Sequence, residues 1–274
     1  MRYGVVIHAR DEEASIRQVL ESLYSQTISP TKVVLCNDMS KDRTGDIAMN
    51  CGAVVVDFPY DHPNWVSDPN LARTVNMALQ EFDDDRLDYI MISGGDSIFP
   101  ADYVESLYRN MKNDDVCVGS GQSEGEHTFA VRGSGRLVSY PWWRSKGLRY
   151  PVLHGFESWL LLVAEHDNRK TRLYPQIKFT QTRPSGTNYT VKVWMNRGRA
   201  MRAMGATKRF VFGRAAVLLL KKHSAKSMVY FLKGYMDKEV VRYDPQLISH
   251  NKQIQNEDLS MKNIPSLFQR FIHS

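Results

Sequence analysis

Hydrophobic residues in the first half of the chain follow two different spacings. Short runs rich in valine and isoleucine have the length of buried β-strands, at residues 3–9, 32–37, 53–58, 88–93 and 116–121. Between these runs, apolar residues recur at intervals of three and four, as do Ile16, Val19, Leu20 and Leu23. That spacing is typical of amphipathic helices, and it predicts helices over residues 12–26, 43–52, 71–82 and 101–113.

Strands that alternate with helices indicate βαβ units, so we expect an α/β fold with a mostly parallel sheet flanked by helices. Ligands bind in such folds beyond the carboxyl ends of the strands. The segments that follow residues 32–37 and 88–93 are therefore the first places to look for functional side chains.

The second half of the chain is less regular. Its pattern predicts one or two strands over residues 172–183, a helix over 193–205 and one or two apolar and basic helices over 210–236. In this last segment an apolar face is predicted from Phe210, Phe212, Val217, Leu220, Tyr230, Phe231 and Tyr235. We expect the polar tail after Pro245 to pack poorly.

No apolar run approaches the roughly 18–20 residues that cross a bilayer, and the chain enters a strand pattern at once, so we expect neither a membrane span nor a signal peptide. The three cysteines, Cys36, Cys51 and Cys117, are scattered and lack a C-x-x-C spacing. This favours reduced thiols and a cytoplasmic location.

The net charge of +6 is divided unevenly along the chain. Residues 1–168 carry 15 Lys and Arg against 25 Asp and Glu, whereas residues 169–274 carry 21 against 5. No acidic residue occurs from Arg169 to Met236. Such a basic region either forms a solvated face or attracts phosphates and anionic lipid headgroups.

Three acidic residues are candidates for chemistry. Asp38 follows the strand at 32–37, and it either caps a turn or accepts hydrogen bonds from a base or ribose. Asp96 follows Gly94 and Gly95 after the strand at 88–93, and it either caps a turn or binds a hard cation such as Mg²⁺ or Mn²⁺. Glu157 begins an apolar helix, where it either complements the helix dipole or acts as a general base.

Three segments of the sequence, in their order along the chain, resemble the family-two glycosyltransferases, which have the GT-A fold. The resemblance begins at "VVIHARDEEASIRQVLESLYSQT", continues through "VVLCNDMSKDRTGDIA" and reaches "MISGGDSIFPADYVESL", similar to the family motif D-x-D-x-x-x-x-P-x-Y-L. It covers roughly Tyr3 to Gly205. It implies a Rossmann-like GT-A catalytic domain over residues 1–205, followed by a basic amphipathic helical C-terminal region over 206–274.

The resemblance also implies roles for individual residues. Glu157 would be the catalytic base, Asp96 the ligand of a weakly held Mg²⁺ or Mn²⁺, and Asp38 the contact to the nucleotide base. Gln181 and Arg183 of "FTQTRPSG" would lie near the diphosphate. The nucleotide-sugar would be lined by Ala9, Asp11, Glu13 (with Glu12 nearby), Asp38, Arg73, Gly94, Gly95 and Arg183.

The sequence departs from the family pattern at three positions. Gly94 replaces the first acid of the D-x-D motif, Gln181 replaces the histidine of a family H-x-R motif, and Asn37 rather than a second aspartate precedes Asp38. The departures imply weak metal binding, with Arg183 able to neutralise part of the leaving group's charge instead.

We therefore expect an inverting glycosyltransferase that moves a sugar from a nucleotide-diphospho-sugar to a glycan or lipid-linked acceptor in cell-envelope glycan synthesis. It would be cytoplasmic, with the C-terminal region as a contact to an anionic membrane surface. The alternatives are a glycosyltransferase-like protein without activity, a sugar nucleotidyltransferase and a basic nucleic-acid-binding protein. The last is disfavoured because the chain has no RNP-like motif, and the nucleotidyltransferase because "HARDEE" is no glycine-rich basic loop.

Overall fold

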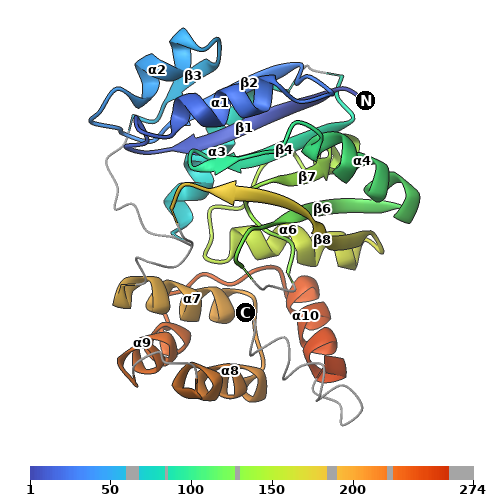
Figure 1. The fold of residues 1–274 in the computed structure, drawn as a ribbon. Helices are drawn as coiled ribbons and strands as arrows, with labels where there is room; N and C mark the ends of the chain where they lie inside the picture. Colours follow the sequence, from blue (N-terminus) through green and yellow to red (C-terminus); the bar gives the residue numbers. More distant parts are fainter. Residues whose placement is uncertain (60–67, 84–85, 127–129, 184–189, 221–224, 259–274) are drawn as a thin grey trace.

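The computed structural model of the 274-residue chain describes residues 1–59, 68–83, 86–126, 130–183, 190–220 and 225–258 (Figure 1). Within them, eight strands form one sheet in the order β3-β2-β1-β4-β7-β6-β8-β5. The strands are β1 (Tyr3–Ala9), β2 (Lys32–Asn37), β3 (Val54–Asp57), β4 (Tyr89–Gly94), β5 (Ser97–Ile98), β6 (Val116–Ser123), β7 (Arg136–Ser139) and β8 (Lys170–Gln181).

The sheet is parallel from β3 through β2 and β1 to β4, as the alternating pattern predicts. β7 then runs antiparallel to both β4 and β6, whereas β6 and β8 are parallel to each other. The carboxyl ends of β1, β2 and β4 therefore meet at one edge of the sheet.

Two hydrophobic cores cover the two faces of the sheet. Side chains alternate along each strand, so Val5 and Ile7 of β1 face one core while Val6 faces the other. The helices of the first core are α1 (Ile16–Tyr24), α2 (Thr44–Asn50) and α4 (Tyr103–Asp114). Those of the second are α3 (Pro69–Gln80), α5 (Tyr140–Ser145) and α6 (Phe156–His166).

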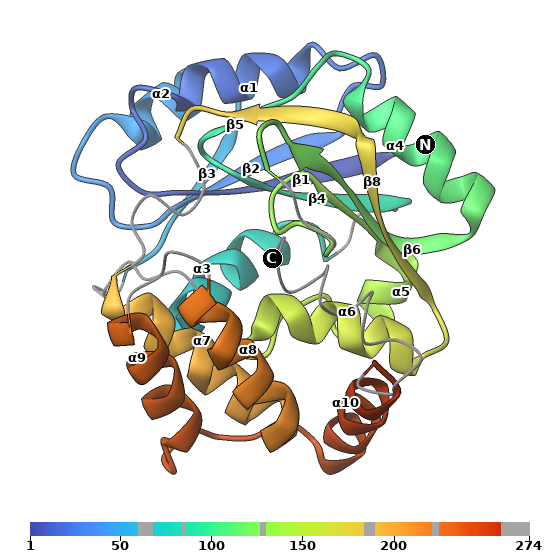
Figure 2. The same ribbon diagram turned by 60° about the horizontal axis from the view of Figure 1, so that its bottom comes forward.

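Four helices make up the C-terminal region: α7 (Val191–Ala203), α8 (Lys208–Leu220), α9 (Ala225–Met236) and α10 (Pro245–Asp258). Figure 2 shows α7, α8 and α9 grouped together to one side of α6, with α10 apart from them beside α6. The helix α7, which falls inside the predicted catalytic range, packs closely on α9, because Gly198 and Gly234 allow the two backbones to approach. Residues 221–224 and 259–274 of the predicted C-terminal region lie outside the described residues.

Much of the predicted apolar face of the C-terminal region is turned inward. Val217 and Phe231 are buried, whereas Phe212 is 58% exposed, and the side chain of Leu220 lies outside the described part. Phe231 belongs to a small core with Trp194 and Val211. The basic helices thus use most of their large apolar side chains to pack against one another.

The expectation that the tail after Pro245 packs poorly is wrong for residues 245–258, which form α10. Leu247 and Ile248 pack against Met204 of α7's end and against α6. Asn251 Nδ2 donates a hydrogen bond to Met204 O at 2.7 Å, and Gln255 Oε1 accepts one from Thr207 N at 2.8 Å. Two of the polar residues therefore bind backbone groups just after α7, which explains why a polar sequence forms a packed helix. No helix of the described residues has the length and apolar character that crossing a bilayer requires.

Candidate active site

The loop after β1 and the loop after β2 are joined by hydrogen bonds that involve two predicted residues. Asp11, whose φ is 55°, accepts a hydrogen bond from Lys41 N at Oδ1 at 2.7 Å and donates its own N–H to Ser40 Oγ at 3.1 Å. Glu13 N donates to Asp42 Oδ2 at 3.0 Å. In the structure, Asp11 and Glu13 thus hold the two loops together, and both side chains are exposed.

Asp38 lies at the centre of this edge and is fully buried. Its N–H donates to Ala9 O at 2.9 Å, and its Oδ2 is 3.2 Å from His8 Nε2 and 3.9 Å from Arg10 Nη1. His8 and Arg10 were not predicted as site residues from the sequence. Their spacing of two at the end of a strand is the signal that could have placed them beside Asp38.

The turn after β4 brings Gly94, Gly95 and Asp96 against the end of β1. Gly95 N donates to the His8 carbonyl at 3.0 Å, and a Cβ on Gly95 would lie 2.9 Å from the Cβ of Ala9. A Cβ on Gly94 would lie 2.8 Å from Asp96 Oδ1. Both glycines therefore allow close approach: Gly95 to the neighbouring strand, and Gly94 to the Asp96 carboxylate folded over it.

Arg183 reaches the same turn from the end of β8. The main chain sets its position, because Thr182 N donates to Asp96 O at 2.9 Å and Gln181 pairs with Ser97 across β8 and β5. The Nη2 atom of Arg183 forms an ion pair with Glu12 Oε1 and lies 3.9 Å from Asp96 Oδ2.

Glu12, rather than the neighbouring Glu13, is the acid of this loop that lies near Asp96. Its side chain is buried, and its Oε2 is 2.8 Å from Ser15 Oγ, which also lies 2.9 Å from Gly95 O. Burial raises the pKa of Glu12, and the nearby Asp96 adds to that effect, while Ser15 and Arg183 oppose it. Of the two neighbouring glutamates, Glu12 is therefore the one that points inward, while Glu13 is exposed.

Glu157 lies in the first turn of α6, after Gly155 and Phe156, at the start of the helix as predicted. Its carboxylate lies against Gly133, where an added Cβ would be 2.6 Å from Oε1. The next residue, Ser134, accepts a hydrogen bond from Gly94 N at 2.9 Å. The segment 133–134 therefore connects Glu157 with the turn that carries Asp96. With the described residues the Glu157 carboxylate makes no hydrogen bond or ion pair.

Arg136 is a buried residue of this site that the sequence analysis missed. Its Nε donates to Arg132 O at 2.8 Å and its Nη1 to the Glu157 carbonyl at 3.4 Å. It also lies beside Tyr150, whose pKa burial raises to about 12, against the effect of Arg136. Arg136 thus fixes the first turn of α6. The segment "VRGSGR", with two arginines around Gly-Ser-Gly, was its signal in the sequence.

Arg73 is the predicted residue that the structure does not connect with the others. It is exposed on α3, and no contact within the described part of the chain joins it to Asp38 or Asp96.

The residues present do not fit a metal site built by the protein. The described segments contain no group of three or more His, Cys, Asp or Glu side chains that could hold a metal ion. At the β4 turn the candidate ligand is Asp96, with Gly94 in place of a second acid and Arg183 beside it. Binding of a divalent cation to Asp96 stays a prediction from the sequence.

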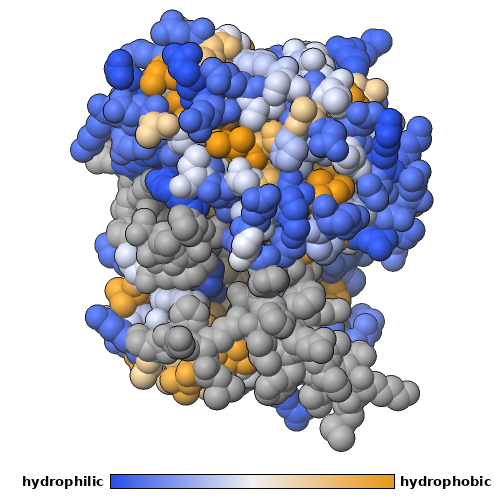
Figure 3. All heavy atoms as spheres, viewed as in Figure 1, coloured by the Kyte–Doolittle hydropathy of each residue, from blue (hydrophilic) through white to orange (hydrophobic). Residues whose placement is uncertain are grey.

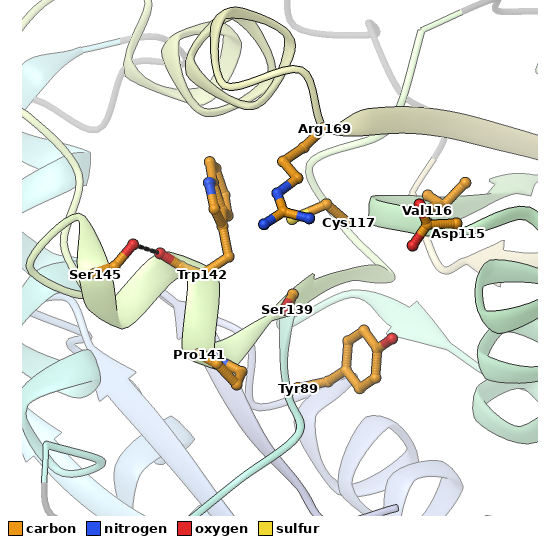
Figure 4. Close-up of a pocket in the computed structure, with 9 residues that line it drawn as sticks. All are labelled: Tyr89, Asp115, Val116, Cys117, Ser139, Pro141, Trp142, Ser145 and Arg169. Carbon is orange, nitrogen blue, oxygen red and sulfur yellow. Dashed lines mark hydrogen bonds between the residues drawn. The ribbon is translucent and has the colours of Figure 1, made fainter.

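A hollow of about 400 Å³ lies at the opposite edge of the sheet (Figure 4). It is lined by the start of β4 at Tyr89 and the start of β6 at Val116, with Trp142 and Arg169 above them. Burial raises the pKa of the Cys117 thiol in this hollow to about 12. The hollow lies away from the carboxyl ends of β1 and β4 and so takes no part in the site described above.

A mostly parallel sheet with acids after β2 and β4 and a third acid at the start of α6 is the arrangement of the GT-A class of sugar transferases. The chain belongs to glycosyl transferase family 2, whose model matches residues 4–159. It is therefore a glycosyltransferase. No curated protein matches the sequence.

Solved structures share this fold at low sequence identity. TarS of S. aureus, residues 1–349 in complex with UDP-GlcNAc, matches with a TM-score of 0.60 and 13% identity over 99% of this chain and 90% of that chain. The mannosyltransferase PcManGT from Pyrobaculum calidifontis, in complex with GDP-Man and Mn²⁺, matches with a TM-score of 0.58 and 13% identity, over 97% and 78%. The glucosyl-3-phosphoglycerate synthase from Mycobacterium tuberculosis, in complex with Mn²⁺, UDP and phosphoglyceric acid, matches with a TM-score of 0.50 and 17% identity, over 66% and 71%.

Proposed function

We propose that the chain is an inverting glycosyltransferase that uses a nucleotide-diphospho-sugar and an acceptor hydroxyl. The observation that carries the proposal is the position of Glu157. Its carboxylate adjoins segment 133–134, which binds the turn of Asp96, so a base lies next to the place expected for the donor. Solved complexes with UDP-GlcNAc or GDP-Man in the same fold support a nucleotide-sugar as the donor.

The proposed reaction is a single displacement. Glu157 takes the proton of the acceptor hydroxyl, and the acceptor oxygen attacks the anomeric carbon from the face opposite the diphosphate. The bond between the anomeric carbon and the diphosphate oxygen breaks, and the nucleoside diphosphate leaves with the electron pair. Arg136 holds the first turn of α6 and so positions Glu157.

Donor binding is assigned to the edge formed by β1, β2 and β4. Asp38 would fix the nucleoside with His8 and Arg10, which already lie against its carboxylate. Ala9, Asp11, Glu13, Gly94 and Gly95 remain proposed lining residues of this pocket, and Arg73 is its most remote proposed member.

Stability measurements with UDP-, GDP- and dTDP-sugars test the donor, and the anomeric configuration of the product tests the mechanism. Stabilisation by one nucleotide series, followed by a product of inverted configuration in NMR spectra, is the expected result. A product of retained configuration would overturn the single displacement. Absence of binding to all three series, together with binding to RNA or DNA, would favour the nucleic-acid alternative.

We further propose that the C-terminal helices attach the enzyme to an anionic membrane surface on its cytoplasmic side, where a lipid-linked acceptor of cell-envelope glycan synthesis would be presented. Phe212 and Leu219 are exposed on α8 and are seven residues apart, as are Val229 and Met236 on α9. Such a spacing places each pair on one side of its helix. Figure 3 shows apolar side chains on the surface of this helical part.

Exposed basic residues accompany this apolar surface. Arg209, Lys226 and Lys233 each precede one of its residues by three positions, and all three are exposed. Each basic side chain near an anionic bilayer adds about 1 kcal/mol to binding. The full chain should co-sediment with anionic vesicles at low salt and release at high salt, and Phe212→Ser with Leu219→Ser should weaken this. Binding that the double variant leaves unchanged would exclude this apolar surface, and a full chain that stays in the supernatant with anionic vesicles would favour a soluble acceptor.

A further inference from the structure

The pair formed by Arg183 and Asp96 lies where the donor's diphosphate is expected, and it decides how the negative charge of the diphosphate is balanced. In PcManGT the fold holds GDP-Man together with Mn²⁺. Here the described residues offer Asp96 without a second acid on β4, because position 94 is glycine. A positive charge that takes the place of the cation must therefore come from the side chains that contact Asp96.

Both oxygens of Asp96 already have partners. Its Oδ1 lies 3.4 Å from Ser97 Oγ and is folded over Gly94, and its Oδ2 lies 3.9 Å from Arg183 Nη2. A divalent cation on Asp96 would have to approach close to this guanidinium, and like charges repel at such distances. The carboxylate and its surroundings thus favour a fixed guanidinium over a mobile metal ion.

The position of Arg183 is determined by the fold. Hydrogen bonding of Thr182 N to Asp96 O and the pairing of Gln181 with Ser97 fix the main chain on its N-terminal side. Glu12, which is itself buried against Ser15, holds Nη2 from the other side. Positioned in advance, the side chain loses little freedom when it binds a ligand.

Arg183 also has the capacity to bind a diphosphate. A guanidinium carries five N–H donors, and the contacts to Glu12 and Asp96 both use Nη2. The side chain is 57% exposed, so its remaining donors are open to a ligand. Arginine binds phosphate oxygens through two parallel hydrogen bonds.

We propose that Arg183 replaces the divalent cation, so that the enzyme binds the diphosphate of its donor without a metal ion. Glu12 and Asp96 then serve as the carboxylates that hold the guanidinium in place. During transfer the same guanidinium stabilises the negative charge that develops on the departing nucleoside diphosphate. The inference rests on the proposed function, because it assumes that the ligand of this edge is a nucleoside diphosphate.

Isothermal titration calorimetry with UDP and GDP tests the inference on the full chain. Protein and nucleotide are compared in EDTA and in MnCl₂. We expect one nucleotide to bind with an affinity that differs by less than about threefold between the two conditions, a difference below 1 kcal/mol. Arg183→Gln should weaken this binding about tenfold to a hundredfold in EDTA, as expected for hydrogen bonds from a charged group.

Arg172→Gln is the matched control. Arg172 lies on β8, the strand that leads to Arg183, is 58% exposed and pairs with Asp114, far from Asp96, so its loss should leave nucleotide binding unchanged. Arg183→Lys keeps the charge but not the two parallel donors, and it should bind with intermediate affinity.

Other outcomes distinguish a failure of the role of Arg183 from a failure of the proposed function. Binding that requires MnCl₂, or binding in EDTA that Arg183→Gln leaves intact, would overturn the role of Arg183 while leaving the proposed glycosyltransferase in place. Failure of UDP and GDP to bind the folded protein in either condition, together with failure of the dTDP series in the stability measurements, would instead contradict the proposed donor edge and the inference with it.

Discussion

Gly198 of α7 and Gly234 of α9 lie where the two helices cross. Because each lacks a side chain, the backbone of the other helix can lie close to it. A Cβ on Gly198 would lie 1.9 Å from Phe231 O, and a Cβ on Gly234 would lie 2.0 Å from Met195 O. Both neighbours are backbone atoms, so the helices themselves would have to move apart. This crossing determines how the C-terminal helices assemble.

Gly198→Ala should therefore destabilise the protein by about 3 kcal/mol, the upper part of the range for overpacked interiors. Gly213→Ala on α8 is the control, because nothing lies within 4 Å of its Cβ and alanine is a better helix former. That variant should be neutral or more stable by up to about 1 kcal/mol. Urea denaturation measures both, and equal stability of the two variants would contradict the crossing.

The ion pair of Arg199 and Asp237 should make stability depend on pH. Arg199 Nε donates to Asp237 Oδ2 at 2.8 Å, and this hydrogen bond lowers the pKa of Asp237 below its ordinary 3.8. The folded state then binds fewer protons than the unfolded state. The stabilisation is complete above the unfolded pKa and is lost as the pH falls from about 3.8 through the folded value.

Asp237→Asn should accordingly lower the free energy of unfolding by about 1 kcal/mol at neutral pH, a typical value for a partly exposed pair. The loss should shrink below pH 3.8. Asp83→Asn, at an exposed carboxylate without an ion pair to any described residue, should leave the profile unchanged. A constant difference between Asp237→Asn and the parent at every pH would assign the effect to packing instead.

Glu157→Gln tests the general base. Nucleotide-sugar binding should be retained, whereas turnover should fall by about 10²–10⁴-fold, the usual share of general-base catalysis. Glu165→Gln lies on the same helix two turns further on and should transfer sugar at the normal rate. Near-normal turnover of Glu157→Gln would leave Glu157 as an acid that complements the start of α6.

Gly94→Asp restores the first acid of the family's D-x-D motif. Its Cβ would lie 2.8 Å from Asp96 Oδ1, so the Asp96 carboxylate must turn, and two carboxylates would face the diphosphate. We expect UDP or GDP to bind roughly tenfold more weakly in EDTA because of the added charge, with MnCl₂ restoring the affinity. Gly94→Ala separates the steric effect from the charge. If MnCl₂ has no effect on Gly94→Asp, the two positions do not form a metal site.

Much of the catalytic fold could be predicted from the sequence, because its strands and helices have strong periods. The strand runs at residues 3–9 and 32–37 coincide with β1 and β2. Glu157 begins its helix as predicted, and Asp38 and Asp96 follow β2 and β4 at the shared carboxyl edge. These local features fix the positions of acids along the chain, and the parallel sheet brings them to one edge.

The remaining features depend on contacts distant in sequence. Arg136 and Ser134 belong to the site because β7 turns back between β4 and β6. The periodicity of the sequence does not predict this strand pairing. Glu12 rather than Glu13 points inward, in a loop where Asp11 takes a positive φ that sequence periodicity does not predict. The helix α10 escaped prediction because Asn251 and Gln255, two of its buried residues, are polar.

The packing of Gly155 against α7 affects which segments can be exchanged between related proteins to make a chimaera. Gly155 precedes the helix of Glu157, and a Cβ on it would lie 3.1 Å from Ala200 Cβ and 3.2 Å from Met204 Sδ, so α7 forms one wall behind the base. In a chimaera that takes only the residues after 205 from a relative, α7 would pack against a foreign helix in place of α9 with its Gly234. Recombination before residue 190 would transfer α7 together with α9 and keep their crossing intact. The helices α7 and α9 are thus inherited as one unit, whereas the contact of α7 with Gly155, ahead of Glu157, is kept only when residues 155–236 stay together.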